Sequence, residues 1–273
     1  MQALTTWHEP TGVLGTLVAE GRGRALALTG RRAALRTAAA AAPPPADFAA
    51  ALRGSGVAVV AEIKRRSPSR GDINPALGLA ERVLGYAAGG AAALSVLTEA
   101  TRFGGSADDL AEARRLVDIP LLRKDFLVDP LQLVEARALG ASAVLLIARA
   151  VPAAELRVLA LAAADQGLQS LIEVRSEREL ESALEAGASV IGVNNRNLET
   201  LEIDPATSER LVPLIPADRP AIYESGVVGR RDVERAAACG ADAVLVGSTL
   251  SAASDAAAAV RALGGVPRLG RGA

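Results

Sequence analysis

Two lysines, Lys64 and Lys124, are the residues of this chain whose type most strongly suggests a chemical task. The chain has 30 lysines and arginines, and all the others are arginine. An ammonium is compact, its pKa responds to its surroundings and it can give up a proton, whereas a guanidinium stays charged at any working pH. Both lysines end apolar, strand-like runs, at 57–64 and 119–125. They could be solvated surface charges, but their placement favours two groups of one reactive site.

Further polar side chains stand at the ends of other apolar runs, and these are Glu62, Glu173, Asn194, Arg196, Glu224 and Ser225. Polar groups that close buried strands need partners, so a ring of them on one face makes a polar pocket. When several carboxylates and ammonium groups lie close together, their pKa values split, which separates acid from base roles near neutral pH. The sequence therefore predicts an acid–base site.

Two glycine–serine pairs indicate a phosphate site. Ser225-Gly226 and Gly247-Ser248 follow the last two apolar runs, where backbone N–H groups, a hydroxyl and the start of a helix near Ser248 can hold an anion. A single Gly-Ser pair is a common turn, but two at neighbouring strand ends favour phosphate binding. Ser67, in the first loop, could reach the same anion or could be a turn residue before a proline.

The elements that must position these residues form an alternating pattern from residue 57 onward. We predict strands at 57–63, 91–97, 119–123, 142–147, 168–174, 189–194, 219–224 and 242–247. We predict helices at 108–117, 130–139, 153–165, 176–186, 230–238 and 252–263, several followed by a helix-ending glycine. Most strands are apolar on both faces, as in a buried parallel sheet. The pattern predicts the α/β class and a (β/α)8 TIM barrel; an open doubly wound sheet fits less well, because polar residues follow nearly every strand.

The two ends of the chain do not follow this pattern. We expect an N-terminal helical extension at 1–56, interrupted at Pro43-Pro44-Pro45, with disorder of its Ala-rich part as the alternative. The barrel is expected to span 57–263, and 264–273 to be a flexible tail.

Composition narrows the class of protein. The net charge of −1 gives no reason to expect a nucleic acid or an anionic membrane as partner. The single cysteine, Cys239, excludes a disulfide framework and a thiolate metal cluster. The N-terminus does not resemble a secretory signal, and no apolar run approaches the ~20 residues needed to cross a bilayer. We expect a cytoplasmic protein whose site binds a small phosphorylated molecule.

Several longer motifs resemble those of the indole-3-glycerol phosphate synthase family of tryptophan biosynthesis. They occur in the family's order and cover roughly 57–250, and the N-terminal extension is also similar. The motifs are AEIKRRSPSRGDI (61–73), SVLTEATRFGGS (95–106), PLLRKDFLVDPLQL (120–133), LIEVRSERELESALEAGA (171–188), IGVNNRNLETLEID (191–204), ESGV (224–227) and VGS (246–248). KDF and GVNNRNL are specific, whereas ESG and VGS alone are not.

The resemblance implies a substrate and a role for each site residue. The substrate would be 1-(2-carboxyphenylamino)-1-deoxyribulose 5-phosphate, which closes to an indole with loss of CO2 and water and without a cofactor or metal. Lys124 would be the general acid of ring closure. The base and second-acid roles would be divided among Glu62, Glu173 and Lys64 in a way that the sequence leaves open. Asn194 and Ser225 would hold polar groups of the substrate, and Glu224 and Arg196 would form the supporting polar shell. Gly226, Gly247 and Ser248 would bind the phosphate, and the aromatic ring would be lined by Phe103, Phe126, Leu145 and Leu198.

Some positions depart from the family pattern. Tyr223 stands where a small residue usually precedes Glu-Ser-Gly, and its ring could narrow the site. Ala100 replaces a usual proline, and Ser251 stands where methionine is frequent. The N-terminal segment lacks the common Lys/Glu-rich helix. None of these changes removes a proposed catalytic group.

Three other interpretations are less well supported. Phosphoribosylanthranilate isomerases resemble this barrel but use a cysteine after the first strand, where this chain has Glu62 and Lys64. A class I aldolase would use one of the lysines as a Schiff-base nucleophile. A catalytically silent relative kept as a binding protein would be expected to lose some of the acid, base and phosphate groups. We expect a monomer by default, since a barrel of this size can be stable alone.

Overall fold

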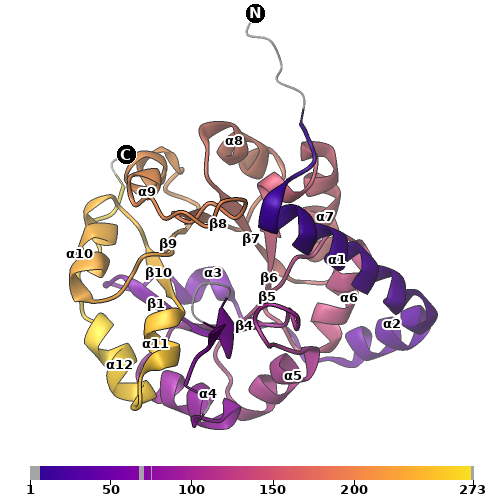
Figure 1. Ribbon diagram of the computed structural model, residues 1–273, viewed down its shortest axis with the longest axis horizontal. Helices are drawn as coiled ribbons and strands as arrows, with labels where there is room; N and C mark the ends of the chain where they lie inside the picture. Colours follow the sequence, from indigo (N-terminus) through magenta and orange to yellow (C-terminus); the bar gives the residue numbers. More distant parts are fainter. Residues whose placement is uncertain (1–6, 68–70, 75, 272–273) are drawn as a thin grey trace, which may run out of the picture.

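Eight parallel strands close into a barrel in the computed structural model, which describes residues 7–67, 71–74 and 76–271 (Figure 1). Around the barrel the order is β1-β10-β9-β8-β7-β6-β5-β4, and β1 pairs with β10 at Ala58↔Ala243. This closure confirms the predicted (β/α)8 fold and rules out an open sheet. The strands are β1 (Ala58–Ile63), β4 (Ala93–Leu97), β5 (Leu121–Lys124), β6 (Ala143–Ile147), β7 (Gln169–Val174), β8 (Val190–Asn194), β9 (Ala221–Glu224) and β10 (Ala243–Val246).

Helices surround the strands in an outer ring. They are α4 (Leu79–Ala88), α5 (Ala107–Leu116), α6 (Pro130–Ala138), α7 (Ala153–Asp165), α8 (Glu177–Glu185), α9 (Ala206–Leu211), α10 (Arg230–Ala238), α11 (Ser248–Ala252) and α12 (Ala256–Leu263). The prediction of a single helix at 252–263 is wrong at its start, because the structure has a break after Ala252 and a new helix from Ala256. There α11 ends at Ala252, and Asp255 caps α12 by accepting a hydrogen bond from the Ala258 N–H at 2.9 Å.

Short αβ loops join helices to strands with the glycines that the sequence predicts. Gly140 and Gly240 have left-handed backbones, with φ of 84° and 90°, which a residue with a Cβ adopts at a cost. Helix and strand approach closely because the core is built from small and branched aliphatic side chains. Ala93, Ala143 and Val244, for example, are fully buried.

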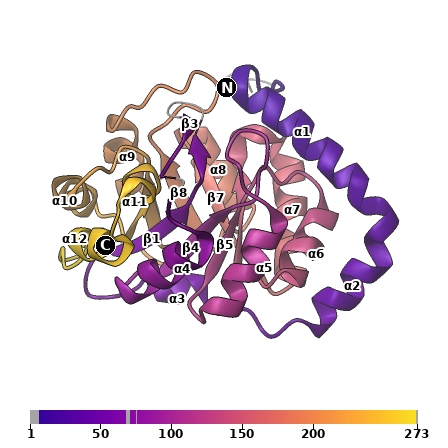
Figure 2. The ribbon, with the colours of Figure 1, turned by 60° about the horizontal axis from the view of Figure 1, so that its bottom comes forward.

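The N-terminal extension is helical, including the Ala-rich part for which disorder was the alternative. It consists of α1 (Gly12–Leu28), a 3-10 turn η1 (Thr29–Arg31), α2 (Arg32–Ala41) and α3 (Phe48–Ala51). In Figures 1 and 2, α1 lies on one side of the barrel, where it contacts α6, and α2 runs along α6. Leu14 and Leu17 of α1 are buried. At the amino ends of the strands, the Ala49 N–H donates to Gln169 at the start of β7.

The C-terminal segment contacts the barrel as far as the structure describes it, and the flexibility expected for 264–273 stays a prediction. Arg268 and Arg271 pair with the two oxygens of Asp242, at 2.7 and 2.8 Å. Val266 is buried and accepts a hydrogen bond from the Val57 N–H. Among the described residues, no helix has the length and hydropathy needed to cross a membrane.

Candidate active site

A cavity opens at the carboxyl ends of the strands and holds about 1070 Å³ not filled by protein atoms, solvent at its mouth included. The structure brings together here every site residue predicted from sequence except Ser67, whose side chain lies outside the described part of the chain. The predicted residues that line the cavity are Glu62, Lys64, Phe103, Lys124, Phe126, Leu145, Glu173, Asn194, Arg196, Leu198, Glu224, Ser225, Gly226, Gly247 and Ser248.

The two lysines share a carboxylate at the centre of the cavity. Lys64 Nζ lies 3.0 Å from Glu62 Oε1, and Lys124 Nζ lies 3.6 Å from Glu62 Oε2. Lys124 Nζ is also 3.3 Å from Glu224 Oε2. These four groups come from the ends of β1, β5 and β9, so the parallel register of the barrel is what assembles them.

Two glycines leave the space that the carboxylates occupy. A Cβ at Gly192 of β8 would lie 2.1 Å from Glu224 Oε1, and one at Gly247 would lie 2.2 Å from Glu62 Oε1. Neither distance is possible for real atoms, so a side chain at either position would displace a carboxylate that contacts Lys124. The glycines are therefore part of how the fold places its charged groups.

The charged groups strongly shift one another's pKa values. Burial raises the pKa of Glu224 to about 8, with Lys124 opposing that rise, so Glu224 holds a proton at neutral pH. Burial also opposes the ionisation of Glu62, but Lys64 and Lys124 outweigh it and hold the pKa of Glu62 below its usual value. Burial would lower the pKa of Lys124, but Glu224, Glu62 and Glu173 together raise it above the ordinary lysine value. The site thus combines an ammonium, an ionised carboxylate and a neutral carboxyl group.

The turn after β9 presents polar groups to the cavity. Ser225 and Gly226 both have left-handed backbones, with φ of 67° and 86°. For serine this conformation is uncommon, and it is held by a hydrogen bond of 2.8 Å from Ser225 Oγ to Asn194 Oδ1. The same Oδ1 accepts the Arg196 N–H at 2.9 Å, so the side chain of Asn194 fixes both loops.

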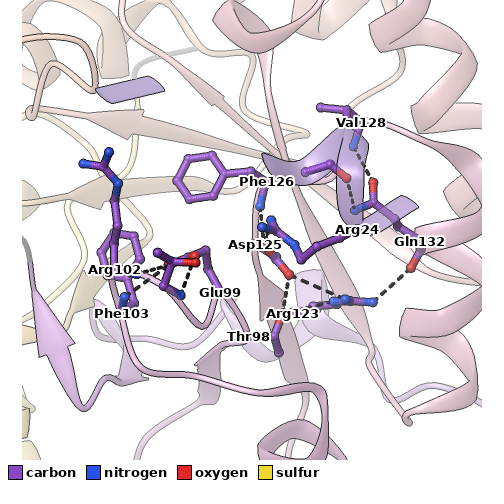
Figure 3. A network of polar contacts seen from close by, with 12 residues as sticks. Arg24, Thr98, Glu99, Arg102, Phe103, Arg123, Asp125, Phe126, Val128 and Gln132 are labelled. Carbon is purple, nitrogen blue, oxygen red and sulfur yellow. Dashed lines mark hydrogen bonds and ion pairs between the residues drawn. The ribbon is translucent and has the colours of Figure 1, made fainter. Parts of the chain in front are cut away.

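The apolar side of the cavity contains two of the chain's three phenylalanines. Phe103 and Phe126 stack with ring centroids 6.4 Å apart and an interplanar angle of 23°. The loop that carries Phe103 is fixed by Glu99, whose carboxylate accepts the backbone N–H groups of Thr101, Arg102 and Phe103 (Figure 3). The arrangement forms a wall against which a flat ring can pack.

Asp125 is a cavity-lining residue that the sequence interpretation did not name, although it lies within the KDF motif. Its buried carboxylate accepts hydrogen bonds from Arg24 at 2.7 Å, Thr98 at 2.7 Å and the Phe126 N–H at 2.8 Å (Figure 3). Arg24 belongs to α1, so this network joins the N-terminal extension to the loop between Lys124 and Phe126. An acidic residue directly after an apolar strand and a lysine was the signal that could have identified it.

Tyr223 does not narrow the cavity, contrary to the expectation from its size. Side chains alternate along β9, so Glu224 faces the cavity while Tyr223 faces the helix layer. Its ring is buried on the side of Arg235 and Cys239 of the α10 region. Within the described ranges, no group of three or more His, Cys, Asp or Glu side chains could hold a metal ion.

Comparison with known proteins gives one consistent match. The sequence model of the indole-3-glycerol phosphate synthase family matches residues 17–263. The chain is 49% identical over 261 residues to indole-3-glycerol phosphate synthase 2 of Streptomyces coelicolor, covering 93% of this chain and 100% of that protein. It is 50% identical over 232 residues to the indole-3-glycerol phosphate synthase of a Nocardioides species, covering 85% and 89%.

Solved structures with low identity share the barrel. Thiamine phosphate pyrophosphorylase from Pyrococcus furiosus has a TM-score of 0.58 at 20% identity, covering 78% of this chain and 95% of that one. The 3-hexulose-6-phosphate synthase from Salmonella typhimurium has a TM-score of 0.60 at 16% identity, covering 76% and 96%. At these identities the likeness supports the fold alone.

Proposed function

The chain belongs to the indole-3-glycerol phosphate synthase family, the carboxy-lyases of tryptophan biosynthesis, and we propose that Lys124 is the general acid of its reaction. The proposed substrate is 1-(2-carboxyphenylamino)-1-deoxyribulose 5-phosphate, and the products are indole-3-glycerol phosphate, CO2 and water. The anilino nitrogen supplies the electrons for ring closure, so the chain itself has to supply only proton transfer, orientation and charge.

Ring closure begins when the ring carbon that bears the carboxylate attacks the ketose carbonyl. The carbonyl oxygen becomes an alkoxide, which is a strong base and takes a proton from Lys124. Glu62 and Glu224 hold the ammonium between them, at 3.6 and 3.3 Å, so it is positioned before substrate binds. The raised pKa of Lys124 keeps it protonated until an alkoxide forms.

The later steps are decarboxylation and dehydration. CO2 leaves with its bonding electrons returned to the ring system, and the new hydroxyl then leaves as water while a carbon-bound proton is removed. We assign the removal of that proton to Glu173. No donor among the described residues hydrogen-bonds to its carboxylate, so its oxygens can accept the proton. We assign Lys64 to protonate the leaving hydroxyl and to contact the phosphate. Its Nζ lies beside the Gly247 turn, because a Cβ built at Gly247 would be only 3.0 Å from it.

Substrate binding divides between the two sides of the cavity. We place the phosphate at the turns after β9 and β10, where Gly226, Gly247 and Ser248 line the wall. We place the aromatic ring against Phe103 and Phe126, with Leu145 and Leu198 completing the apolar contact. We assign Asn194, Ser225 and Arg196, which also line the cavity, to the substrate's hydroxyl and carboxylate groups.

The observation that carries this proposal is the Lys124 ammonium between the Glu62 carboxylate and the Glu224 carboxyl group, in a cavity with an aromatic wall and two glycine turns. The test is incubation of the protein with the anilino-deoxyribulose phosphate while indole fluorescence and released CO2 are measured. Equal amounts of the two products are expected. Absence of indole product, or a borohydride-trapped covalent adduct on a lysine, would contradict the proposal, because ring closure forms no Schiff base.

A further inference from the structure

A second cavity adjoins the active-site cavity beside α1, α8 and the end of β7, and we call it the side chamber. It holds about 630 Å³ not filled by protein atoms, part of it open to solvent. Its lining residues are Leu14, Ile147, Arg149, Glu173, Arg175, Glu179, Asn197, Leu198 and Glu199. Three of them, Ile147, Glu173 and Leu198, also line the active-site cavity. Figure 1 labels α1, α8 and β7, the elements that border the side chamber.

Glu173 therefore faces both cavities. The residue is only 3% exposed, yet no donor in the described part of the chain hydrogen-bonds to its carboxylate. Buried carboxylates ordinarily have partners, counting ordered water. The side chamber can supply water, because it is roomy and lined by charged groups such as Arg149 and Arg175.

Glu179 is the titratable group of the side chamber with the properties of a proton relay. Its carboxylate accepts the Arg175 N–H at 2.7 Å, which fixes its position on the first turn of α8. Burial raises the pKa of Glu179, and the charge of Glu173 adds to that effect, so its protonation lies closer to neutrality than that of a surface glutamate. Besides Glu173, the other charged groups that line the chamber are Arg149 of η2 (Ala148–Ala150), Arg175 and Glu199. Arg149 pairs with Glu199 at 3.0 Å.

This inference rests on the proposed function, whose reaction takes up one proton from solvent in each turnover. The ketone oxygen leaves as water, which takes two protons. One proton is returned when the carbon-bound hydrogen is removed. The carboxylate leaves as neutral CO2, so each turnover consumes one proton net. That proton must return to the site before the next ring closure.

We propose that the side chamber is the proton-entry route of this enzyme and that Glu179 is its relay to Glu173. A proton passes from solvent to the Glu179 carboxylate and through chamber water to Glu173. From there it reaches the Lys124 region of the active site. The mouth of the main cavity is filled while substrate or product is bound, whereas the chamber gives Glu173 a separate opening. Glu179 does not touch the substrate, so it acts through Glu173.

The test compares Glu179→Gln with Glu181→Gln. Glu181 lies on the same helix but is exposed and outside the chamber, so its replacement controls for the loss of a helix charge. A glutamine at 179 can still accept the Arg175 N–H, and Glu179→Asp keeps a titratable group should the glutamine variant fold poorly. Turnover is measured at saturating substrate, in low and high concentrations of formate or imidazole, and at several pH values.

The relay predicts that Glu179→Gln lowers kcat roughly three- to tenfold in dilute buffer, with KM within about twofold of wild type. Formate or imidazole should restore the rate in a saturable way, Glu179→Asp should keep more activity, and Glu181→Gln should behave as wild type. Equal kinetics of the two glutamine variants, in single-turnover and multiple-turnover experiments, would overturn the relay. A loss of kcat that no buffer restores would also overturn it. If wild type formed no indole product at all, the proposed function would fail instead.

Discussion

Gly192→Ala should damage catalysis more than it damages the fold. The new Cβ would lie 2.1 Å from Glu224 Oε1, so the carboxylate must move by about 1 Å or more to reach ordinary contact distance. Glu224 is the nearer of the two acidic side chains that hold Lys124 Nζ, at 3.3 Å. A misplacement of ~1 Å in a catalytic group can lower the rate ~100-fold. We therefore expect kcat to fall ~10–100-fold in the indole-fluorescence assay.

The same substitution also brings the Cβ within 3.1 Å of Leu171 Cδ1, and overpacking of this kind costs about 1–3 kcal/mol of unfolding free energy. Gly23→Ala in α1 is a matched control, because a Cβ there meets nothing within 4 Å. It should keep kcat and stabilise the fold by up to ~1 kcal/mol. If Gly192→Ala acts by moving Glu224, it should have little further effect in a Glu224→Ala background. An equal loss of kcat in both backgrounds would refute the reasoning.

Further predictions concern pH and the buried network. Glu224 has a folded-state pKa of about 8 against 4.5 for an ordinary glutamate, so the fold should lose stability as pH rises between these values. The slope should approach ~1.4 kcal/mol per pH unit, and Glu224→Gln should remove it in urea titrations at several pH values. Arg24→Ala deprives the buried Asp125 of a donor at 2.7 Å and should cost about 1–3 kcal/mol in thermal or urea unfolding. Arg22→Ala, which breaks only an exposed pair with Glu9, should cost less than ~1 kcal/mol and serves as the control.

The sequence predicted the barrel and the cavity residues because both follow from short-range patterns. Strands buried on both faces have to be apolar along their length, so the polar residues Glu62, Glu173 and Glu224 stand out at or near the strand ends. Parallel strands of a closed barrel carry those ends to one face, which is why Lys64 and Lys124 meet although their loops are far apart in sequence.

What could not be predicted depends on contacts between distant segments. Asp125 is buried with Arg24, which lies 101 positions earlier on a helix outside the barrel pattern. Asp242 holds the C-terminal segment through Arg268 and Arg271, and nothing in that Gly- and Arg-rich stretch indicates a partner. Gly192 reads as an ordinary strand residue, and only the position of Glu224 shows why a side chain is excluded there. The side chamber likewise exists only because α1 lies beside the β8–α9 loop.

The measurement that tests the central claim most directly is the steady-state kinetics of Lys124→Arg with the anilino-deoxyribulose phosphate. Arginine keeps the positive charge between Glu62 and Glu224 but cannot give up a proton at working pH. If Lys124 protonates the nascent alkoxide, kcat should fall ~10²–10⁴-fold while KM changes modestly. Turnover close to that of wild type would show that charge alone suffices at this position and would contradict the assignment of Lys124 as the general acid.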